Sequence, residues 1–394
     1  MKIINLIFLS YCILEIFPLD NGLGKTPQMG WNTWNKYGCN INSELIEKSI
    51  TFLANSELND AGYRYINLDD CWQEEERDST TNKIVPDRNR FPKDIKMLSG
   101  SAHRNNLYLG LYSDAGTKTC AGKAGSLGYE DIDAKTYAEW EIDYLKYDNC
   151  YNENKPAKER YTVMRDALKN SNRQIFYSIC NWGEEDIPQW GKDVGNSWRT
   201  TGDISDMWLS MLRIIDIKDQ YHQYAGPGGW NDPDMLEVGN GKLTEDENIA
   251  HFSLWCMMAA PLMLGNDIRK LLDGNGDPVQ NSATLKILTN KQLIAIDQDT
   301  LCKPAKRVAK SGGVDILARP LSNGDVALCL FNGKGSSGTA RFNLDALTED
   351  EYLDFGKVSA YEIHDLWTDE RTVTSNLNIS VPKHSVKVYR VKTI

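Results

Sequence analysis

A lysine and an aspartate lie two residues apart in the stretch 144–150, which has the composition of a short buried strand that runs into a loop. Side chains on a strand alternate between its two faces, so Lys146 and Asp148 point the same way. A carboxylate beside a cation stays ionised at neutral pH. Asp148 can therefore act as a nucleophile or form a structural ion pair with Lys146, and the stretch taken alone favours the ion pair.

Polar and aromatic residues also follow the other strands that the sequence predicts. Strands near residues 29–34, 63–68, 107–112, 144–148, 175–179 and 261–265 alternate with helices near 42–62, 94–105, 133–142 and 244–258. A further helix begins at Pro156, and two more strand ends are predicted near Asp203 and Asp232. Steps of 23 to 42 residues separate one strand end from the next, which is typical of repeated βα units.

Eight such strands before about residue 270 predict an α/β fold of the (β/α)₈ TIM-barrel class, with the barrel over residues 21–303. A doubly wound sheet is the alternative, but no Gly-x-Gly-x-x-Gly follows the first strand. After residue 303, short β-rich runs at 314–317, 326–331, 358–363 and 386–391 and the hairpin signal Asn323-Gly324 predict a C-terminal antiparallel β-sandwich domain over 304–394. We assign this domain a structural role, with a sugar-binding module as the alternative.

In a barrel the carboxyl ends of all the strands share one mouth. The side chains expected to meet there are Asp69, Asp70, Asp148, Asp203 and Asp234, with Trp34, Tyr112, Trp182 and Arg199. Such a set suits a sugar or a divalent metal ion. We predict no metal, because the five histidines lie away from the strand ends and because Lys146 and Arg199 add positive charge. No Gly-x-Ser-x-Gly is present, which argues against a serine hydrolase.

Glycoside hydrolysis needs two carboxyl groups, one ionised and one protonated near neutral or mildly acidic pH. Asp148 suits the ionised role because Lys146 lies beside it. Asp203 suits the acid because a crowd of acidic neighbours would raise its pKa, although Arg199 opposes that shift. The spacing alone leaves the division of roles open.

Charge and the N-terminal segment bear on partners and location. The net charge of −11 argues against nucleic acid or an anionic membrane surface as partner. Residues 1–17 combine Lys2 with a short apolar run, which predicts a signal peptide over about residues 1–20 and a secreted or lysosomal protein. A buried N-terminal helix or anchor is the alternative. No second hydrophobic span follows, so no membrane insertion is expected.

Six motifs occur in order along the chain: Met29-Gly30-Trp31-Asn32, Asp69-Asp70-Cys71-Trp72, Tyr112-Ser113-Asp114-Ala115-Gly116, Lys146-Tyr147-Asp148, Arg199-x-x-x-Asp203 and Gly228-Gly229-Trp230-Asn231-Asp232-Pro233-Asp234-Met235. Together they resemble the α-galactosidases (melibiases) of glycoside hydrolase family 27, from about residue 21 to the C-terminus. The resemblance implies a TIM barrel with a C-terminal antiparallel β domain, no cofactor, and a retaining double displacement on α-galactosides. It implies that Asp148 is the nucleophile and Asp203 the acid/base.

The same resemblance assigns the sugar pocket. Asp69 and Asp70 would hold the galactose 4- and 6-hydroxyls, and Lys146 would also contact the sugar. The rest of the pocket would come from Trp34, Tyr112, Arg199 and Asp234.

The segment Cys180-Asn181-Trp182 follows the fifth predicted strand, where the family sets its specificity at the sugar's 2-position. A bulky Trp182 beside Cys180 should leave no room for an N-acetyl group, so galactose is favoured. Asn181 stands where several relatives have Glu, which leaves its side chain without an assigned role. The intact Asp69-Asp70 pair disfavours arabinopyranosides. The alternatives are an α-N-acetylgalactosaminidase of the same family and a catalytically inactive sugar-binding barrel.

The resemblance further implies the disulfides Cys39–Cys71 and Cys120–Cys150, the second of which would hold the loop that follows Asp148. Asn378-Ile379-Ser380 is a glycosylation sequon, as suits a secreted chain. The oligomeric state stays open, a homodimer included.

Overall fold

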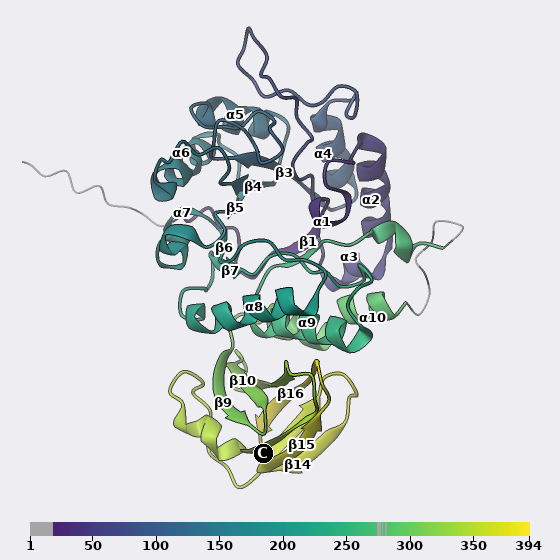
Figure 1. Cartoon of the computed structure of the whole chain (residues 1–394), viewed down its shortest axis with the longest axis vertical. Helices are drawn as coiled ribbons and strands as arrows, with labels where there is room; N and C mark the ends of the chain where they lie inside the picture. The colour runs from purple at the N-terminus through teal and green to yellow at the C-terminus, as the bar shows by residue number, and fades with distance from the viewer. Residues whose placement is uncertain (1–18, 274–276, 278, 280–281) are drawn as a thin grey trace, which may run out of the picture.

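The structure of the chain, a computed structural model, describes residues 19–273, 277, 279 and 282–394. Nearly all of the predicted signal peptide, residues 1–18, lies outside this range. Figure 1 shows a barrel that carries most of the chain and, beneath it, a smaller β domain that ends at the C-terminus. None of the described helices is both long enough and apolar enough to cross a membrane.

Eight parallel strands form the barrel sheet, as the strand cadence predicted (Figure 1). They are β1 (Met29–Asn32), β2 (Tyr65–Asn67), β3 (Tyr108–Asp114), β4 (Tyr144–Asp148), β5 (Phe176–Ile179), β6 (Ser197–Arg199), β7 (Trp230–Asp232) and β8 (Leu262–Leu264). Their order in the sheet is β7-β6-β5-β4-β3-β2-β1-β8. The barrel closes just beyond β7, where Leu236 pairs in parallel with Leu264 and its N–H donates to the Met263 carbonyl at 2.7 Å. The carboxyl ends of the strands therefore surround one mouth.

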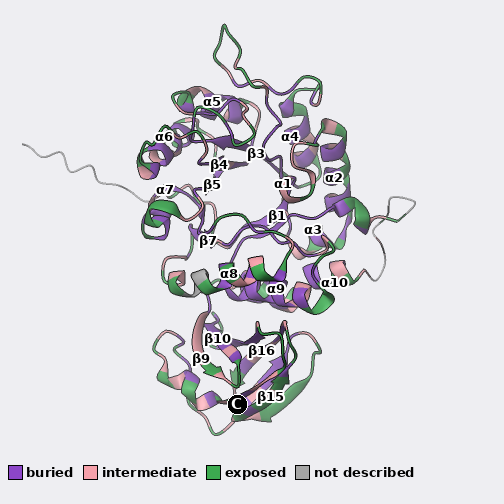
Figure 2. Ribbon diagram, viewed as in Figure 1, coloured by how far each residue is buried: buried purple, intermediate pink, exposed green. Residues whose placement is uncertain are grey.

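Helices cover the outside of this sheet. They are α1 (Trp34–Tyr37), α2 (Ser43–Asn55), α3 (Glu57–Ala61), α4 (Ile95–Arg104), α5 (Glu130–Glu139), α6 (Ala157–Asn170), α7 (Gly191–Val194), α8 (Trp208–Lys218), α9 (Glu245–Met257), α10 (Ala283–Leu288) and α11 (Lys291–Asp297), with the 3₁₀ segments η1 (Glu184–Gln189), η2 (Asp219–Tyr221) and η3 (Ile268–Leu271). Figure 2 shows buried residues along the strands and exposed residues on the outer helix faces. β1, β5, β6 and β8 are buried along their whole length, as expected for parallel strands covered by helices.

The single helix predicted over residues 42–62 is two helices. α2 ends at Asn55, and Ser56 in extended backbone (φ −101°, ψ 162°) separates it from α3. The cap of α2 is Asn42, whose side chain accepts the Leu45 N–H at 2.8 Å. Gly62 ends α3 in a left-handed conformation (φ 108°), as predicted. The break was hidden because the apolar period continues through Ser56.

The C-terminal part is an antiparallel β sandwich. Its elements are β9 (Lys306–Ser311), β10 (Val314–Pro320), β11 (Val326–Asn332), β12 (Gly338–Asn343), η4 (Leu344–Glu349), β13 (Tyr361–Asp365), β14 (Arg371–Thr374), β15 (Asn376–Val381) and β16 (Ser385–Thr393). Six strands pair in the order β14-β13-β16-β11-β10-β9, and β12 pairs with β15. Asn323-Gly324 lies in the turn between β10 and β11, where Gly324 has φ 86°. The sequence missed β9, β12, β14 and β15 because these strands are half exposed and lack an apolar run.

Arg319 on β10 places its charged guanidinium in the interface between the sandwich and the barrel. Its side chain is fully buried, and its Nη1 donates to the Cys256 carbonyl of α9 at 2.8 Å. Burial lowers the pKa of this guanidinium, and nearby Asp297 opposes the shift. Burial likewise raises the pKa of Asp297 far above its ordinary value. The charge of each side chain opposes the pKa shift of the other, but burial remains the larger effect on both.

We expect Arg319→Ala to lower the free energy of unfolding by about 1–3 kcal/mol, because it removes a charged donor from the buried Cys256 carbonyl. Urea unfolding followed by tryptophan fluorescence measures the loss. The matched control is Arg390→Ala on β16, since that side chain is 36% exposed and lies 3.8 Å from Asp325. The control should change stability by about 0.5 kcal/mol or less. Equal stability of the two variants would contradict the role given to Arg319.

Candidate active site

The mouth of the barrel holds a pocket at the carboxyl ends of the strands. Its wall is formed by Trp34, Asn35, Asp69, Asp70, Tyr112, Cys120, Lys146, Asp148, Trp182, Arg199, Asp203, Asp234 and Met235. Every residue predicted for the pocket lies in this wall except Cys180. Residues as far apart in the sequence as Trp34 and Met235 therefore meet around one small volume, as the barrel topology requires.

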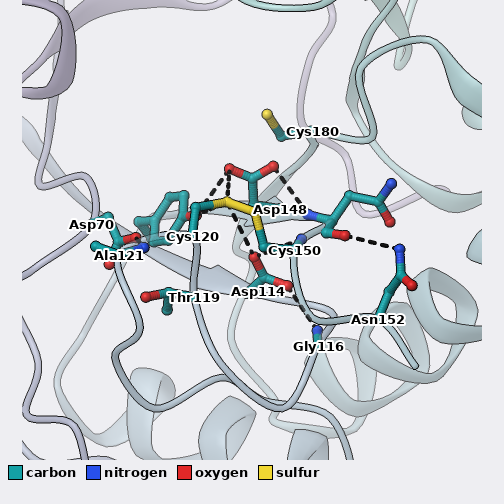
Figure 3. Close-up of a disulfide and its surroundings, with 12 residues drawn as sticks. Asp70, Asp114, Gly116, Thr119, Cys120, Ala121, Asp148, Cys150, Asn152 and Cys180 are labelled. Atoms are coloured by element: carbon teal, nitrogen blue, oxygen red, sulfur yellow. Dashed lines mark hydrogen bonds between the residues drawn. A yellow bond between two sulfur atoms is a disulfide. The ribbon is translucent and has the colours of Figure 1, made fainter. Parts of the chain in front are cut away.

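Asp148 ends β4 and has only 7% of its surface exposed. Its Oδ2 accepts the Tyr112 hydroxyl at 2.9 Å, and its Oδ1 accepts the backbone N–H of Asn149 at 3.0 Å. Figure 3 shows this carboxylate between the Cys120–Cys150 disulfide and the side chain of Cys180. Because both oxygens are bonded, the orientation of the carboxylate is fixed.

Lys146 makes its ion pair with Asp69 and not with Asp148. Its Nζ lies 2.7 Å from Asp69 Oδ2 and 5.3 Å from the centroid of the Tyr112 ring. The amide of Asn32 donates to the same Asp69 oxygen at 2.8 Å. The sequence considered an ion pair between Lys146 and Asp148. In the structure Lys146 on β4 pairs instead with Asp69, which follows β2.

Asp70 faces the loop that follows β3. Its Oδ2 accepts the Ala121 N–H at 2.8 Å, and its Oδ1 accepts the Cys71 N–H at 2.7 Å. Burial raises the pKa of Asp70. Cys71, next in the chain, has a left-handed backbone (φ 75°) and is bonded to Cys39. The disulfide therefore holds the turn that brings the tandem aspartates into the pocket.

Arg199 forms ion pairs with two carboxylates of the pocket, those of Asp203 and Asp234. Its Nη2 lies 3.0 Å from Asp203 Oδ1 and 3.0 Å from Asp234 Oδ2. The side chains of Arg199 and Asp234 are 3% and 5% exposed, whereas that of Asp203 is 68% exposed. Burial raises the pKa of Asp234 to about 6, although Arg199 opposes the shift. Asp203 is therefore the carboxyl that incoming water can reach.

The electrostatic grounds on which the sequence divided the two carboxyl roles are wrong for the unliganded protein. Burial raises the pKa of Asp148, although Lys146 and the Tyr112 hydroxyl oppose it. Burial acts on Asp203 in the same direction, but the charges of Arg199 and Lys146 outweigh it and hold the pKa of Asp203 below its ordinary value. The sequence shows neither the depth of Asp148 nor the direct contact between Arg199 and Asp203.

Cys180 lies one layer below the pocket wall. It is 1% exposed, its sulfur is 3.6 Å from Arg199 Nη1, and burial raises the pKa of its thiol far above the ordinary value. Trp182 does reach the wall, from a left-handed backbone (φ 61°) that precedes Gly183. Asn181 donates to the Glu184 carbonyl at 2.8 Å and is absent from the wall, which agrees with the lack of a role for it.

Three wall residues were not predicted for the pocket: Asn35, Cys120 and Met235. Asn35 follows Trp34 on α1 and donates to Glu237 Oε1 at 2.5 Å. Burial raises the pKa of Glu237 to about 7. The sequence offered one signal for these residues, the position of Met235 at the end of the last of the six motifs, but it gave no chemical reason to select Met235.

Both expected disulfides are formed, Cys39–Cys71 and Cys120–Cys150. The remaining described cysteines, at positions 180, 256, 302 and 329, are free and buried. Asn378 is exposed on β15, where its side chain is accessible. Its glycosylation stays a prediction.

The family model described as alpha galactosidase A matches residues 26–299, and that of the alpha galactosidase C-terminal beta sandwich domain matches residues 311–391. Alpha-galactosidase 2 of Arabidopsis thaliana is 46% identical over 374 residues, which cover 94% of this chain and 90% of the relative. The solved structure of an α-galactosidase from Saccharomyces cerevisiae is 33% identical, with a TM-score of 0.88 over 96% of this chain and 100% of that chain. A structure of the Saccharomyces cerevisiae enzyme with raffinose has a TM-score of 0.85 at 33% identity, over 94% of this chain and 98% of that chain.

We expect Arg199→Gln to raise the pKa of Asp203, because the cation that holds this pKa down is removed while the partial burial remains. Proton loss from Asp203 would then occur at higher pH than in the unaltered protein. The measurement is the carboxyl-carbon chemical shift of Asp203 against pH in protein labelled at aspartate, with Asp203→Asn to assign the signal. Arg269→Gln is the control, since Arg269 pairs with Asp267 at 2.9 Å and is not part of the pocket wall. An unchanged titration of Asp203 in Arg199→Gln would contradict the assignment.

Proposed function

The chain belongs to the α-galactosidases of glycoside hydrolase family 27, and we propose that it hydrolyses terminal, non-reducing α-linked galactose with retention of anomeric configuration. The observation that carries the proposal is the contrast between two carboxyls of one pocket. Asp148 is buried and fixed through both oxygens, whereas the side chain of Asp203 is 68% exposed. A nucleophile needs a fixed position, and an acid/base must exchange protons with water.

In the first step Asp148 attacks the anomeric carbon of galactose. The bond from this carbon to the glycosidic oxygen breaks, a bond to the Asp148 carboxylate forms, and Asp203 gives its proton to the departing oxygen. In the second step Asp203 takes a proton from water, and the water oxygen replaces Asp148 at the anomeric carbon. Two inversions give net retention.

The low pKa of Asp203 in the free protein bears on the first step. Arg199 holds this carboxyl ionised in the absence of substrate. A bound galactoside would cover the exposed side of Asp203 and remove water from it, and this desolvation raises the pKa. Once Asp148 is esterified, one negative charge leaves the pocket, which favours the ionised, basic form of Asp203 for the second step.

Asp69 and Asp70 supply the sugar-binding carboxylates of the proposal. Lys146 and Asn32 occupy Asp69 Oδ2, and its Oδ1 accepts the Asp70 N–H at 2.9 Å, so the carboxylate is held in place for a hydroxyl donor. Galactose differs from glucose by the axial 4-hydroxyl. The wrong epimer would leave a buried carboxylate without its donor, at a cost of about 1–3 kcal/mol or more.

We further propose that the chain enters the secretory route behind the signal peptide predicted over residues 1–20. The two disulfides suit an oxidising compartment. N-terminal sequencing of protein secreted from a eukaryotic host tests this, since an uncleaved Met1 would refute it. A homodimer remains an open proposal that light scattering would test.

Asp148→Asn should abolish release of the aryl alcohol from an aryl α-galactoside, because the amide cannot form the glycosyl ester. The loss expected is at least about 10⁴-fold in kcat. Proton NMR of the first-formed galactose from the unaltered protein should show the α anomer. Near-normal turnover by Asp148→Asn, or a β-anomeric first product, would sink the assignment. Thermal unfolding of the variant serves as control for its fold.

The matching aryl α-N-acetylgalactosaminide should be turned over far more slowly than the α-galactoside, because Trp182 occupies the room that an N-acetyl group needs. A ratio of kcat/KM above about 10² is expected, the scale on which a steric mismatch discriminates. Trp182→Ala should reduce that ratio, whereas Trp190→Phe, at a residue outside the pocket wall, should not. Comparable turnover of both substrates by the unaltered protein would favour the α-N-acetylgalactosaminidase alternative.

A further inference from the structure

Asp114 is a fully buried carboxyl that none of the steps above uses. It ends β3, in register with Asp148 at the end of β4. It is absent from the pocket wall, so it cannot touch a bound sugar directly. No ion pair to Asp114 occurs among the residues that the structure describes. A buried acid without a counter-ion costs free energy, and acids of this kind gather at functional sites.

The carboxyl of Asp114 joins the loop after β3 to the loop after β4. Its Oδ1 accepts the Gly116 N–H at 2.8 Å, and its Oδ2 accepts the Cys150 N–H at 3.0 Å (Figure 3). Cys150 is only two residues beyond Asp148. The bond to Cys150 therefore acts on the backbone that immediately follows the proposed nucleophile.

The Cys120–Cys150 disulfide ties the same two loops. The Cys120 sulfur lies 3.5 Å from Asp148 Oδ2 and 3.7 Å from Asp114 Oδ2, so it sits between the two carboxyls. Cys150 is thus held twice, through its backbone N–H by Asp114 and through its sulfur by Cys120. Asp114 and these two sulfurs also have the spacing of a metal site, but the sulfurs are bonded to each other and offer no thiolate ligands.

The two loops touch so closely that only glycine fits at the contact. A Cβ on Gly116 would lie 1.9 Å from the Cys150 carbonyl oxygen and 2.7 Å from the Tyr151 carbonyl carbon. The Thr117 N–H also donates to the Tyr151 carbonyl at 3.1 Å. The position of the loop after Asp148 is therefore set by the loop after β3, and Asp114 is the side chain that fastens them.

A simpler account is that Asp114 only completes a turn, as buried aspartates do through bonds to nearby backbone N–H groups. The bond to Gly116 fits that account, because it spans two residues. The bond to Cys150 does not, because it spans 36 residues and reaches the loop that follows the nucleophile. The closeness of Asp148 also matters, since burial and then the charge of Asp148 raise the pKa of Asp114 far above its ordinary value.

We propose that Asp114 is a positioning residue for the nucleophile, and that it acts with the Cys120–Cys150 disulfide to hold the backbone after Asp148 in the attacking geometry. The inference rests on the proposed role of Asp148. Loss of the Asp114 bonds would let this backbone shift, and a displacement of about 1 Å at a reacting atom can cost about 10²-fold in rate. Because Asp114 is outside the pocket wall, sugar binding would change little.

The test compares Asp114→Asn, which keeps the shape and one acceptor, with Asp114→Ala, which keeps neither bond. Hydrolysis of an aryl α-galactoside gives kcat, and calorimetry with galactose gives Kd. We expect kcat to fall about 10- to 100-fold in Asp114→Ala and less in Asp114→Asn, with Kd for galactose within about threefold of the unaltered protein. The matched control is Asp297→Asn, at another fully buried aspartate with a raised pKa that is not part of the pocket wall, which should change neither constant.

A second arm repeats Asp114→Asn in the Cys120→Ala/Cys150→Ala background. If the carboxyl and the disulfide share one task, Asp114→Asn will lower kcat by a larger factor in this background than in the protein that has the disulfide. The same factor in both backgrounds would overturn the shared task. If Asp114→Ala does not fold, Asp114→Asn decides: kcat within twofold of the unaltered protein overturns the proposal, and so does an equal loss of kcat and galactose affinity.

The proposed function can fail separately from this inference. An unaltered protein that does not hydrolyse the galactoside, or an active Asp148→Asn variant, refutes the proposed function. Normal kcat in Asp114→Asn beside an inactive Asp148→Asn refutes only the role of Asp114.

Discussion

Two cations, the partly buried Lys146 and the buried Arg199, hold together carboxylates of the pocket that would otherwise repel one another. Lys146 lies 2.7 Å from Asp69, and Arg199 lies 3.0 Å from both Asp203 and Asp234. Burial raises the pKa of a carboxyl that has no cation beside it, as it does for Asp114. The charges of Arg199 and Lys146 hold the pKa of Asp203 below its ordinary value, whereas burial outweighs them at Asp148 and Asp234.

The barrel supplies the positions that these charges require. Lys146 and Asp148 share one face of β4, Tyr112 comes from β3, and Arg199 ends β6, so each group stands on a buried strand with little freedom to move. The loops beyond the strand ends are less constrained by the sheet, and there the protein adds covalent ties. One disulfide holds the turn after Asp70, and the other joins the loops after β3 and β4.

The β sandwich contacts the barrel through α9, and none of its described residues lies in the pocket wall. Strands β11 and β16 pack on α9, and Arg319 reaches from β10 to the Cys256 carbonyl of the same helix. α9 in turn supports the segment after β7, since the Trp255 indole donates to the Asp234 carbonyl at 2.8 Å. A contact path therefore runs from the sandwich to Asp234, without any residue of the sandwich in the pocket wall.

The sequence by itself predicted the fold class and most of the pocket wall, and the family resemblance of its motifs implied both disulfide pairs. The period of the strands is local, and the motifs that mark the strand ends are short, so both can be found without coordinates. Only the tertiary structure decided that Lys146 pairs with Asp69, 77 residues away, and that Cys180 lies below the wall. It also decided that Asp114 bonds to the loop of Asp148, and that burial raises the pKa of Asp148 while Arg199 lowers that of Asp203. The reason is physical: a partner and a pKa depend on distance and burial among residues far apart in the chain, and neither quantity exists before the chain is folded.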